Sequence, residues 1–476
     1  MNFGYKRVVI FLTILFLLFH SYSVPAVQTE TTLNHSPIII DGNDDFTSQN
    51  GVTGGSGSID NPYRIENWSI TTDGIAHYGI EIRNTTAFFI IQNCTIIRFY
   101  HSDDYTYAGI KYFNVENGEM QFCSCSQNFD GMDVSNSTNI TINNCSFYEN
   151  LNKGVRIKNS QKVQTSHCLI TNNKDEGFYI SDESTGIQIT HCFIDRNKGS
   201  GIEIYESTEI QVYHTILSNN SWMGIWAYNP TVQMMRYIID NCTVSDNSLA
   251  GIDLESYKGH PSYSQITNCM IQYNGIGHGG HGLRLRGLSH NLIDNCTFRH
   301  NEVIGLVIAS GNNVISNCSM YSHLSTPVLG MGISFEGRGP PFIGRGLYSG
   351  KDNILKYCTI YDNMIGISLT FIRRTVIHHC NITQNHLMGF STAFACCAKI
   401  FQNNIVRNGF PYPTVNGSGV MPWWSFLDMR ENWWGAADGP IYRFHEGHGD
   451  TIVGWLSYVL FSPWLSEPVP DAGRQT

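Results

Sequence analysis

Aromatic and ionisable residues recur in pairs between positions 179 and 286, with one residue, usually apolar, separating the two members of a pair. Neighbouring carboxylates can serve as general acid and base, and the flat faces of aromatic rings offer apolar surface to a sugar ring. Arginine forks suit carboxylate groups. These chemistries need the side chains to share one face, so the surrounding pattern has to place them. The residues are Tyr179, Glu203, Tyr205, Trp226, Tyr228, Asp253, Glu255, Arg284 and Arg286.

A repeated motif, Gly-h-x-h with h mostly apolar, supplies that placement. Seven of the twelve spacings between successive motifs fall at 22–24 residues, which suits one coil of three short strands and three turns. Gly and Asn are frequent, as tight turns require, and charged residues make up only 14%. The sequence predicts an all-β fold, a single-stranded right-handed parallel β-helix solenoid of about thirteen coils with caps at both ends. The motifs begin at Gly79, Gly109, Gly131, Gly154, Gly177, Gly201, Gly224, Gly251, Gly282, Gly305, Gly332, Gly366 and Gly389.

Alternation within the motif puts the two h side chains inside and their neighbours outside. All nine residues above then point outward from one sheet. The Gly-to-Cys spacing lengthens from 14 to 18 in the coils that begin at Gly224 and Gly251, which indicates long turns beside a groove. We expect Glu203, Asp253 and Arg284 to be catalytic and the remaining six to bind substrate. The alternative is that Asp253–Arg284 and Glu255–Arg286 are ion pairs between coils that only hold the sheet together.

Most of the fourteen cysteines belong to a second motif, Asn-Cys-x-h, about fourteen residues after each glycine. The apolar parity reverses at the Asn, which indicates a sharp turn between two inward-facing strands. The sequence therefore predicts one inward column of buried free thiols that behave as small apolar groups. Cys396 and Cys397 fall outside this column and are the best candidates for a disulfide.

Several histidine and acidic residues are candidate metal ligands. His167, His191 and His214 occupy equivalent turns in three consecutive coils, where ring stacking is the favoured interpretation and copper binding the alternative. His260, His278 and His281 lie near the expected groove. The segment from Asp41 to Asp45 is rich in calcium-type ligands but lacks a later bidentate Glu, which favours a role in the cap. No cofactor and no metal site is predicted, with calcium and copper left as open alternatives.

The chain begins with the features of an export signal. Lys6 and Arg7 precede the apolar run Val8 to Phe19, and small residues follow at 24–26. We expect a secreted or cell-surface protein, with membrane association only if this segment is uncleaved. The net charge of −10 argues against nucleic acid as a partner. The expected organisation is signal peptide 1–26, N-terminal cap and first coil entry 27–78, β-helix 79–410, C-terminal cap 411–466 and tail 467–476.

These coils resemble the parallel β-helix repeats of the pectin-lyase-like superfamily. The opening Ile38-Ile39-Ile40-Asp41-Gly42-Asn43 and the closing Asn432-Trp433-Trp434-Gly435 resemble the caps of archaeal β-helix proteins of the NosD type. That superfamily contains polysaccharide lyases, glycoside hydrolases, sugar epimerases, adhesins and a copper-delivery accessory protein. The resemblance implies a protein that binds extracellular or envelope carbohydrate, as a binding protein or as a lyase or hydrolase. A passive surface scaffold and a NosD-like metal-delivery role are the alternatives.

Overall fold

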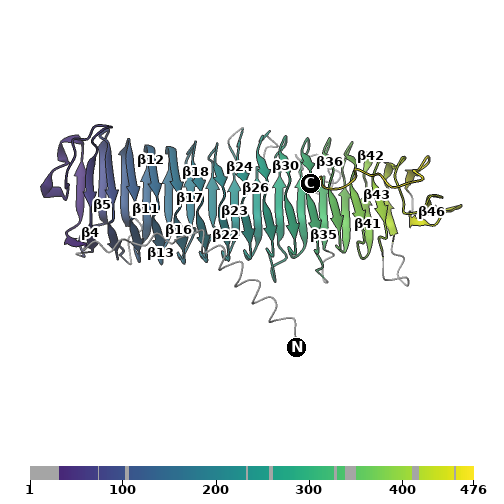
Figure 1. The fold of residues 1–476 in the computed structure, drawn as a ribbon, viewed down its shortest axis with the longest axis horizontal. Helices are drawn as coiled ribbons and strands as arrows, with labels where there is room; N and C mark the ends of the chain where they lie inside the picture. Colours follow the sequence, from purple (N-terminus) through teal and green to yellow (C-terminus); the bar gives the residue numbers. More distant parts are fainter. Residues whose placement is uncertain are drawn as a thin grey trace, which may run out of the picture.

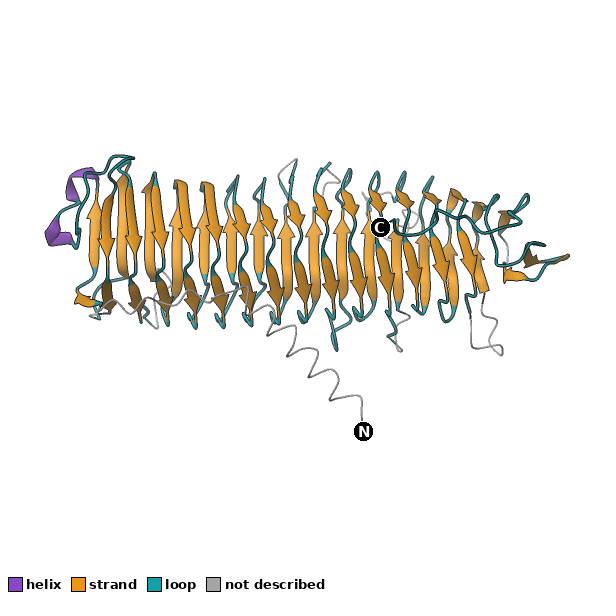
Figure 2. Ribbon diagram, in the orientation of Figure 1, coloured by secondary structure: helices purple, strands orange, loops and turns teal. Residues whose placement is uncertain are grey.

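The computed structural model describes residues 32–475, apart from 73, 102–106, 232–233, 257–260, 326–329, 338–349, 410–417 and 455–456. The predicted signal segment and His260 lie outside the described residues. The described chain winds into one elongated solenoid, with the N-terminal rungs at one end and the C-terminal rungs at the other (Figure 1). Strands make up almost all of it, and two short 3-10 helices, η1 (Asn43–Asp45) and η2 (Ser48–Asn50), lie at the N-terminal end (Figure 2).

Each rung contributes one strand to each of three parallel sheets. The first sheet consists of β1 (Leu33–His35), β4 (Trp68–Thr71), β7 (Thr95–Ile97), β10 (Ser124–Ser126), β13 (Ser146–Tyr148), β16 (Leu169–Thr171), β19 (Phe193–Asp195), β22 (Ile216–Ser218), β25 (Thr243–Ser245), β28 (Met270–Gln272), β31 (Thr297–Arg299), β34 (Ser319–Tyr321), β37 (Thr359–Tyr361), β40 (Asn381–Thr383) and β43 (Asn404–Val406).

The second sheet carries the Gly-h-x-h motifs. It consists of β2 (Ile38–Asp41), β5 (Tyr78–Thr85), β8 (Ala108–Val115), β11 (Asp130–Ser135), β14 (Val155–Lys158), β17 (Phe178–Ser181), β20 (Ile202–Tyr205), β23 (Met223–Tyr228), β26 (Ala250–Glu255), β29 (His281–Arg286), β32 (Ile304–Ala309), β35 (Met331–Glu336), β38 (Ile365–Thr370), β41 (Met388–Ala393) and β44 (Ser418–Trp423).

The third sheet completes each rung. It consists of β3 (Tyr63–Glu66), β6 (Phe89–Gln92), β9 (Gly118–Gln121), β12 (Thr138–Asn143), β15 (Gln161–Ser166), β18 (Gln188–Thr190), β21 (Gln211–Tyr213), β24 (Ile238–Asp240), β27 (Gln265–Thr267), β30 (Leu292–Asp294), β33 (Val314–Ser316), β36 (Ile354–Lys356), β39 (Val376–His378), β42 (Cys396–Phe401), β45 (Phe426–Asp428) and β49 (Tyr458–Leu460).

The predicted right-handed parallel β-helix of about thirteen coils is confirmed. The thirteen predicted motifs coincide with the thirteen strands from β5 to β41 of the second sheet, and β2 and β44 add one strand at each end. Ile202 and Ile204 of β20 are buried as the alternation requires, while Glu203 and Tyr205 between and after them are only partly covered. The period of two in strand side chains therefore decides which residues form the core.

The core also contains the thiol column. All twelve cysteines before Cys396 are buried and free, as predicted for those of the Asn-Cys motif. Burial raises the pKa of the Cys125 and Cys318 thiols, which keeps them protonated and unreactive. Cys396 and Cys397 are also free, and both are exposed, so the expected disulfide between them is not present.

A buried amide ladder runs beside the second sheet, and the sequence did not reveal it. Asn150 donates from Nδ2 to the Oδ1 of Asn173 at 2.9 Å, and this contact repeats rung after rung in one direction. A Cβ added to Gly131 would lie 2.4 Å from the carbonyl oxygen of Gly154 and 2.8 Å from Asn150 Nδ2. Most of the motif glycines are therefore required because the ladder and the neighbouring backbone occupy the space of a side chain. The ladder ends when Asn408 donates to Asp450 at 2.8 Å.

The two ends of the solenoid differ. A small sheet of β46 (Pro440–Tyr442), β47 (His445–Glu446) and β48 (Gly449–Thr451) closes the C-terminal end. The tail then returns along the first sheet, so that the C-terminus lies well back from that end (Figure 1). Arg474 binds Asn295 Oδ1 at 2.6 Å and Thr297 Oγ1 at 2.8 Å. Within the described ranges, no helix is long and apolar enough to span a membrane.

Candidate functional site

All nine residues singled out from the sequence lie on the outward face of the second sheet. The strand register aligns Tyr179 with Glu203, Glu203 with Trp226, and Trp226 with Asp253. We call this line the first outward column. It consists, in order, of Lys111, Asp133, Arg156, Tyr179, Glu203, Trp226, Asp253 and Arg284. The second outward column lies two residues later on each strand and contains Tyr205, Tyr228, Glu255 and Arg286.

Asp253 and Arg284 form a closed ion pair. Arg284 Nε donates to Asp253 Oδ1 at 3.0 Å, a second guanidinium nitrogen meets Oδ2, and Asp253 is only 1% exposed. Burial lowers the pKa of Arg284, but the hydrogen bond and charge of Asp253 outweigh it and raise that pKa. Arg286 pairs with Glu255 at 3.1 Å. The structure thus shows the ion pairs between coils that the sequence left open as the alternative to catalysis.

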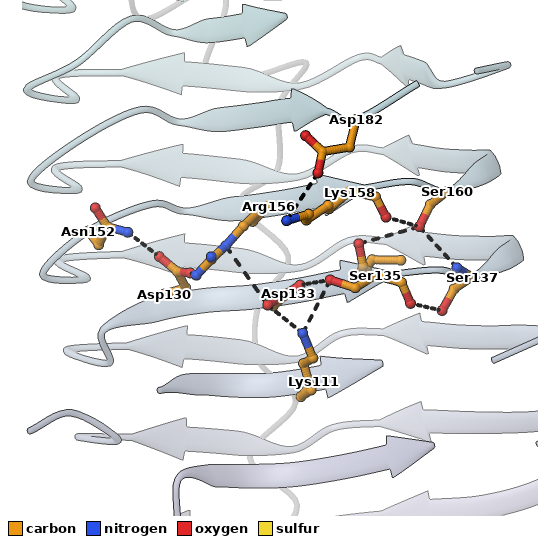
Figure 3. Close-up of polar contacts among 11 residues, drawn as sticks. Lys111, Asp130, Asp133, Ser135, Ser137, Asn152, Arg156, Lys158, Ser160 and Asp182 are labelled. Atoms are coloured by element: carbon orange, nitrogen blue, oxygen red, sulfur yellow. Dashed lines mark hydrogen bonds and ion pairs between the residues drawn. The ribbon is translucent and has the colours of Figure 1, made fainter. Parts of the chain in front are cut away.

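The opposite end of the first outward column is also paired, because acids and bases alternate along it. Lys111 Nζ lies 2.6 Å from Asp133, whose other oxygen accepts from Ser135 at 2.6 Å. Arg156 contacts two carboxylates of the preceding rung, both on β11. Asp133 lies 3.9 Å away, and the fully buried Asp130 forms the closer ion pair. Figure 3 shows this chain of contacts crossing the rungs. Its charges are largely balanced internally.

Glu203 lies where this alternation of charge is interrupted. Its neighbours in the column are Tyr179 and Trp226, so neither flanking rung offers a cation in register. Burial, followed by the nearby Glu176 carboxylate, raises the pKa of Glu203 from 4.5 to about 8, against the opposing effect of Lys153. The neighbouring Glu203 and Glu176 carboxyl groups thus compete for a proton, and the raised pKa favours Glu203 as its carrier. A neutral carboxyl group between two aromatic rings can donate a hydrogen bond or a proton to an oxygen that approaches it.

Glu176 and Lys153, which sequence reasoning missed, immediately precede motif glycines. Lys153 Nζ bonds Asp175 at 2.7 Å and Glu176 at 2.8 Å, and it lies 4.9 Å from the centre of the Tyr179 ring. Burial, the largest cause, raises the pKa of Glu176. Lys153 and Glu176 both line the first cavity of the groove, although the residue before the glycine lies outside the Gly-h-x-h motif from which the outward face was predicted.

These side chains line a groove. One cavity of about 460 Å³ has Glu203, Glu176, Lys153 and Tyr179 in its wall, and the next, of about 360 Å³, shares Arg156 with it. A third cavity, of about 730 Å³, shares Leu151 with the first and extends over the turn toward the first sheet. The first cavity is lined by Phe129, Leu151, Asn152, Lys153, Arg156, Glu176, Tyr179 and Glu203, and the second by Tyr78, Lys111, Phe113, Asp133, Ser135, Asn136, Arg156 and Lys158.

The structure brings Tyr179 and Glu203 into this groove, places Tyr205 beside it on the rung of Glu203, and places the other predicted residues on the rungs that follow. Tyr205 and Tyr228 contact each other at 5.9 Å between ring centres, and Trp226 lies 6.1 Å from the exposed Trp222. Trp222 follows the turn before the motif glycine and was not among the predicted residues. Tyr205, Trp222, Trp226 and Tyr228 form an aromatic patch beside the groove, and the two arginine pairs lie on the rungs that follow it.

The candidate metal residues have other contacts. The rings of His167, His191 and His214 stack at 5.0 and 4.7 Å, which confirms the stacking interpretation. Burial lowers the pKa of His281 to about 4, and its Nδ1 has no hydrogen-bond partner within the described part of the chain. Asp41 contacts Arg83 at 3.0 Å within the cap. Among the described residues, no group of three or more His, Cys, Asp or Glu side chains is arranged to hold a metal ion.

Comparison with known proteins gives one family. The model of the family described as "Right handed beta helix region" matches residues 38–194, 78–232 and 200–340. No curated protein matches the sequence.

Among solved structures, the similar chains are distant in sequence. The Dettilon tailspike protein is 14% identical, with a TM-score of 0.46 over 60% of this chain and 59% of its own, so this chain spans less than two thirds of the tailspike. The A-module of a mannuronan C-5 epimerase from Azotobacter vinelandii is 12% identical, with a TM-score of 0.37 over 75% and 88% of the two chains. A pectate lyase is 13% identical, with a TM-score of 0.31 over 70% and 76%.

Proposed function

The chain belongs to the right-handed β-helix family, and from that premise we propose that it is an exported protein that binds a polysaccharide along the groove of its second sheet. The observation that carries this proposal is the position of Glu203 in the wall of the groove, between Tyr179 and Trp226 in the first outward column. Sugar hydroxyls need fixed donors and acceptors beside an apolar surface, and this arrangement supplies both.

The repeat of the fold suits a repeating ligand. Rungs follow each other at about 4.8 Å, so equivalent side chains recur at a fixed spacing along the groove. Tyr179 and Trp226 lie two rungs apart in register, with Glu203 between them, which leaves room for sugar rings on both sides of the carboxyl group. A polymer that runs over several rungs would contact the aromatic patch and the groove at the same time.

The charge of the groove favours uncharged sugars. Lys111 and Arg156 are already neutralised by Asp133 and Asp130, and Lys153 contacts Asp175 and Glu176. Because these cations have carboxylate partners, an acidic polymer would have to displace existing ion pairs. The groove thus offers hydrogen-bonding groups more readily than free positive charge.

Hydrolysis of the bound polymer is a second candidate, favoured by the proton on Glu203. A glycosidase needs a protonated acid at the scissile oxygen, whereas a lyase needs an unprotonated base. Glu203 is suited to the first role. The expected partner Asp253 lies two rungs away, about 10 Å by rung spacing, near the upper separation for an inverting enzyme. Its ion pair with Arg284 leaves binding without turnover as the leading proposal.

Glycan-array binding followed by calorimetry on the hits tests this function. We expect Tyr179→Ala and Trp226→Ala each to weaken binding by roughly tenfold or more, since each removes a buried ring contact. Tyr458→Ala is the matched control, because Tyr458 is an exposed aromatic residue on the third sheet. Equal affinities for all four proteins would show that the groove is misplaced.

Turnover is tested separately by measuring released reducing ends and unsaturated uronates. Glu203→Gln should keep binding and abolish any hydrolysis, since the amide cannot supply an acidic proton. A protein that binds no neutral or acidic glycan would instead favour the passive surface scaffold. Metal analysis of the purified protein tests the remaining alternative, a metal-delivery role.

A further inference from the structure

Cys396 and Cys397 form a pair of thiols unlike every other cysteine of the chain. Their sulfur atoms lie 3.0 Å apart, and both side chains are exposed, whereas the other twelve cysteines are buried. The pair lies at the start of β42 on the third sheet, remote in sequence from the groove residues of the second sheet. It is therefore independent of the proposed polysaccharide site.

The local backbone explains why adjacent side chains share a face. Consecutive residues of a strand normally point to opposite sides of the sheet. Here the pairing of β42 with β45 shifts register between Cys396 and Ala398, and Cys397 adopts a left-handed conformation with φ of 60°. Both thiols consequently face solvent instead of one entering the core.

The geometry is unfavourable for a disulfide. The Cα atoms of adjacent residues are about 3.8 Å apart, below the range of about 4.4–6.8 Å that ordinary disulfides span. The sulfur atoms are also a full ångström farther apart than the bonded distance of about 2.05 Å. The structure thus holds the two cysteines as reduced thiols in close contact.

An ion bound by both sulfur atoms fits the observed geometry better than a disulfide does. An ion about 2.3 Å from each sulfur would make an S–ion–S angle of about 80° at the observed separation of 3.0 Å. That angle is well below the tetrahedral value that zinc requires, and it suits a pyramidal centre with a lone pair. The backbone of Arg373 pairs with that of Cys396 on the neighbouring rung. The hydrogen bond with Cys397, followed by burial, raises the pKa of Cys396 against the opposing charge of Arg373, so the resting pair is protonated and releases its protons when an ion binds.

We propose that Cys396 and Cys397 are a bidentate binding site for soft, thiophilic ions of pyramidal geometry, of which trivalent arsenic is the type. With an organic arsenoxide, two S–As bonds form and the As=O bond breaks. The two thiol protons leave with the oxygen as water, and no atom changes oxidation state. The exposed position lets the ion reach the sulfurs without opening the solenoid.

Phenylarsine oxide is the probe, with native mass spectrometry as the measurement. The wild-type protein should take up one arsenical per chain, resist removal by a monothiol and release it to a dithiol. Cys396→Ser and Cys397→Ser should each weaken binding by roughly 100-fold or more, because a single thiolate loses the chelate. The buried Cys380→Ser variant is the matched control and should bind as wild type does.

Competition with zinc and a check that the variants fold complete the test. Zinc chloride at the same concentration should not displace the arsenical, and far-UV circular dichroism should show that the three variants keep the β-helix. Uptake that survives in either single variant, or zinc competition as strong as that of a dithiol, would overturn the proposal. Uptake of several arsenicals by the native protein would also overturn it, since it would mean that the buried column is accessible.

Discussion

Replacing Asp253 with Asn tests whether this carboxylate has a structural role or is available for catalysis. The variant keeps the volume of the side chain but removes its charge, which leaves Arg284 partly buried without a counter-charge. Removing one partner of a buried pair typically costs about 3–5 kcal/mol. Because the Arg284 side chain is 24% exposed and water can reach it, we expect the lower end, about 3 kcal/mol. That corresponds to roughly a 150-fold change in the unfolding equilibrium.

Denaturant titration followed by far-UV circular dichroism measures this loss. Asp352→Asn is the matched control: Asp352 also forms a two-point contact with Arg374, at 2.7 and 2.6 Å, but both side chains are substantially exposed. We expect little change in the control, because solvent screens an exposed pair. Long repeat arrays can unfold in more than one step, so the comparison rests on the shift relative to the control.

The outcome that refutes this reasoning is an Asp253→Asn protein as stable as the control variant. The pair would then contribute nothing in solution, and Asp253 would be available for chemistry. A second variant sharpens the result. Replacing the pair with Leu at 253 and Met at 284 should recover most of the lost stability, because apolar residues of similar volume remove both desolvated charges.

Three other outcomes follow from the structure. Ile204→Asp should destabilise the protein by about 4 kcal/mol or more, by placing an unpaired charge in the core, whereas Tyr205→Asp should be tolerated; equal losses of circular dichroism signal would contradict the inward and outward assignment. In the native protein a thiol reagent should modify only Cys396 and Cys397, and it should reach the other twelve cysteines only after denaturation. Disulfides along the buried thiol column, detected by mass spectrometry, would refute the assignment of those cysteines as free thiols. The pKa of Glu203 in the folded protein, about 8, exceeds its ordinary 4.5, so the contribution of Glu203 to stability is complete below about pH 4.5 and is lost as pH rises through 8. Glu203→Gln should therefore flatten the decline of the denaturation midpoint with pH. An unchanged slope would show that Glu203 is ionised like a surface acid.

The parts of the fold that depend on periodicity could be predicted from the sequence. The spacing of Gly201 and Gly224 and the alternation around Ile202 and Ile204 determined the coil, the core and the outward face. The amide ladder through Asn150 was missed because its residues lie in turns, where no strand parity indicates direction.

The chemistry of the site was harder to predict, because it depends on neighbours on other rungs. The sequence placed Glu203 on the outward face but could not show that Tyr179 and Trp226 flank it, or that burial and the Glu176 carboxylate raise its pKa. It also could not decide between an active and a paired Asp253, since that depends on one contact with Arg284. Glu176 was missed because it precedes the motif glycine and so lies outside the Gly-h-x-h alternation from which the outward residues were predicted.

The amide ladder gives the solenoid a polarity. From Asn150 to Asn301, and again from Asn363 to Asn408, each Asn donates a hydrogen bond to the next one toward the C-terminus, and His323 occupies the rung between these two runs. Within either run every rung presents the same donor on one side and the same acceptor on the other, so an additional coil can be inserted by duplication with the ladder contact preserved. The end is different: Asp450 receives from Asn408 and, as a carboxylate, has no donor to pass on. Length is thus the freely variable property of this architecture, and termination is the one that needs a dedicated residue.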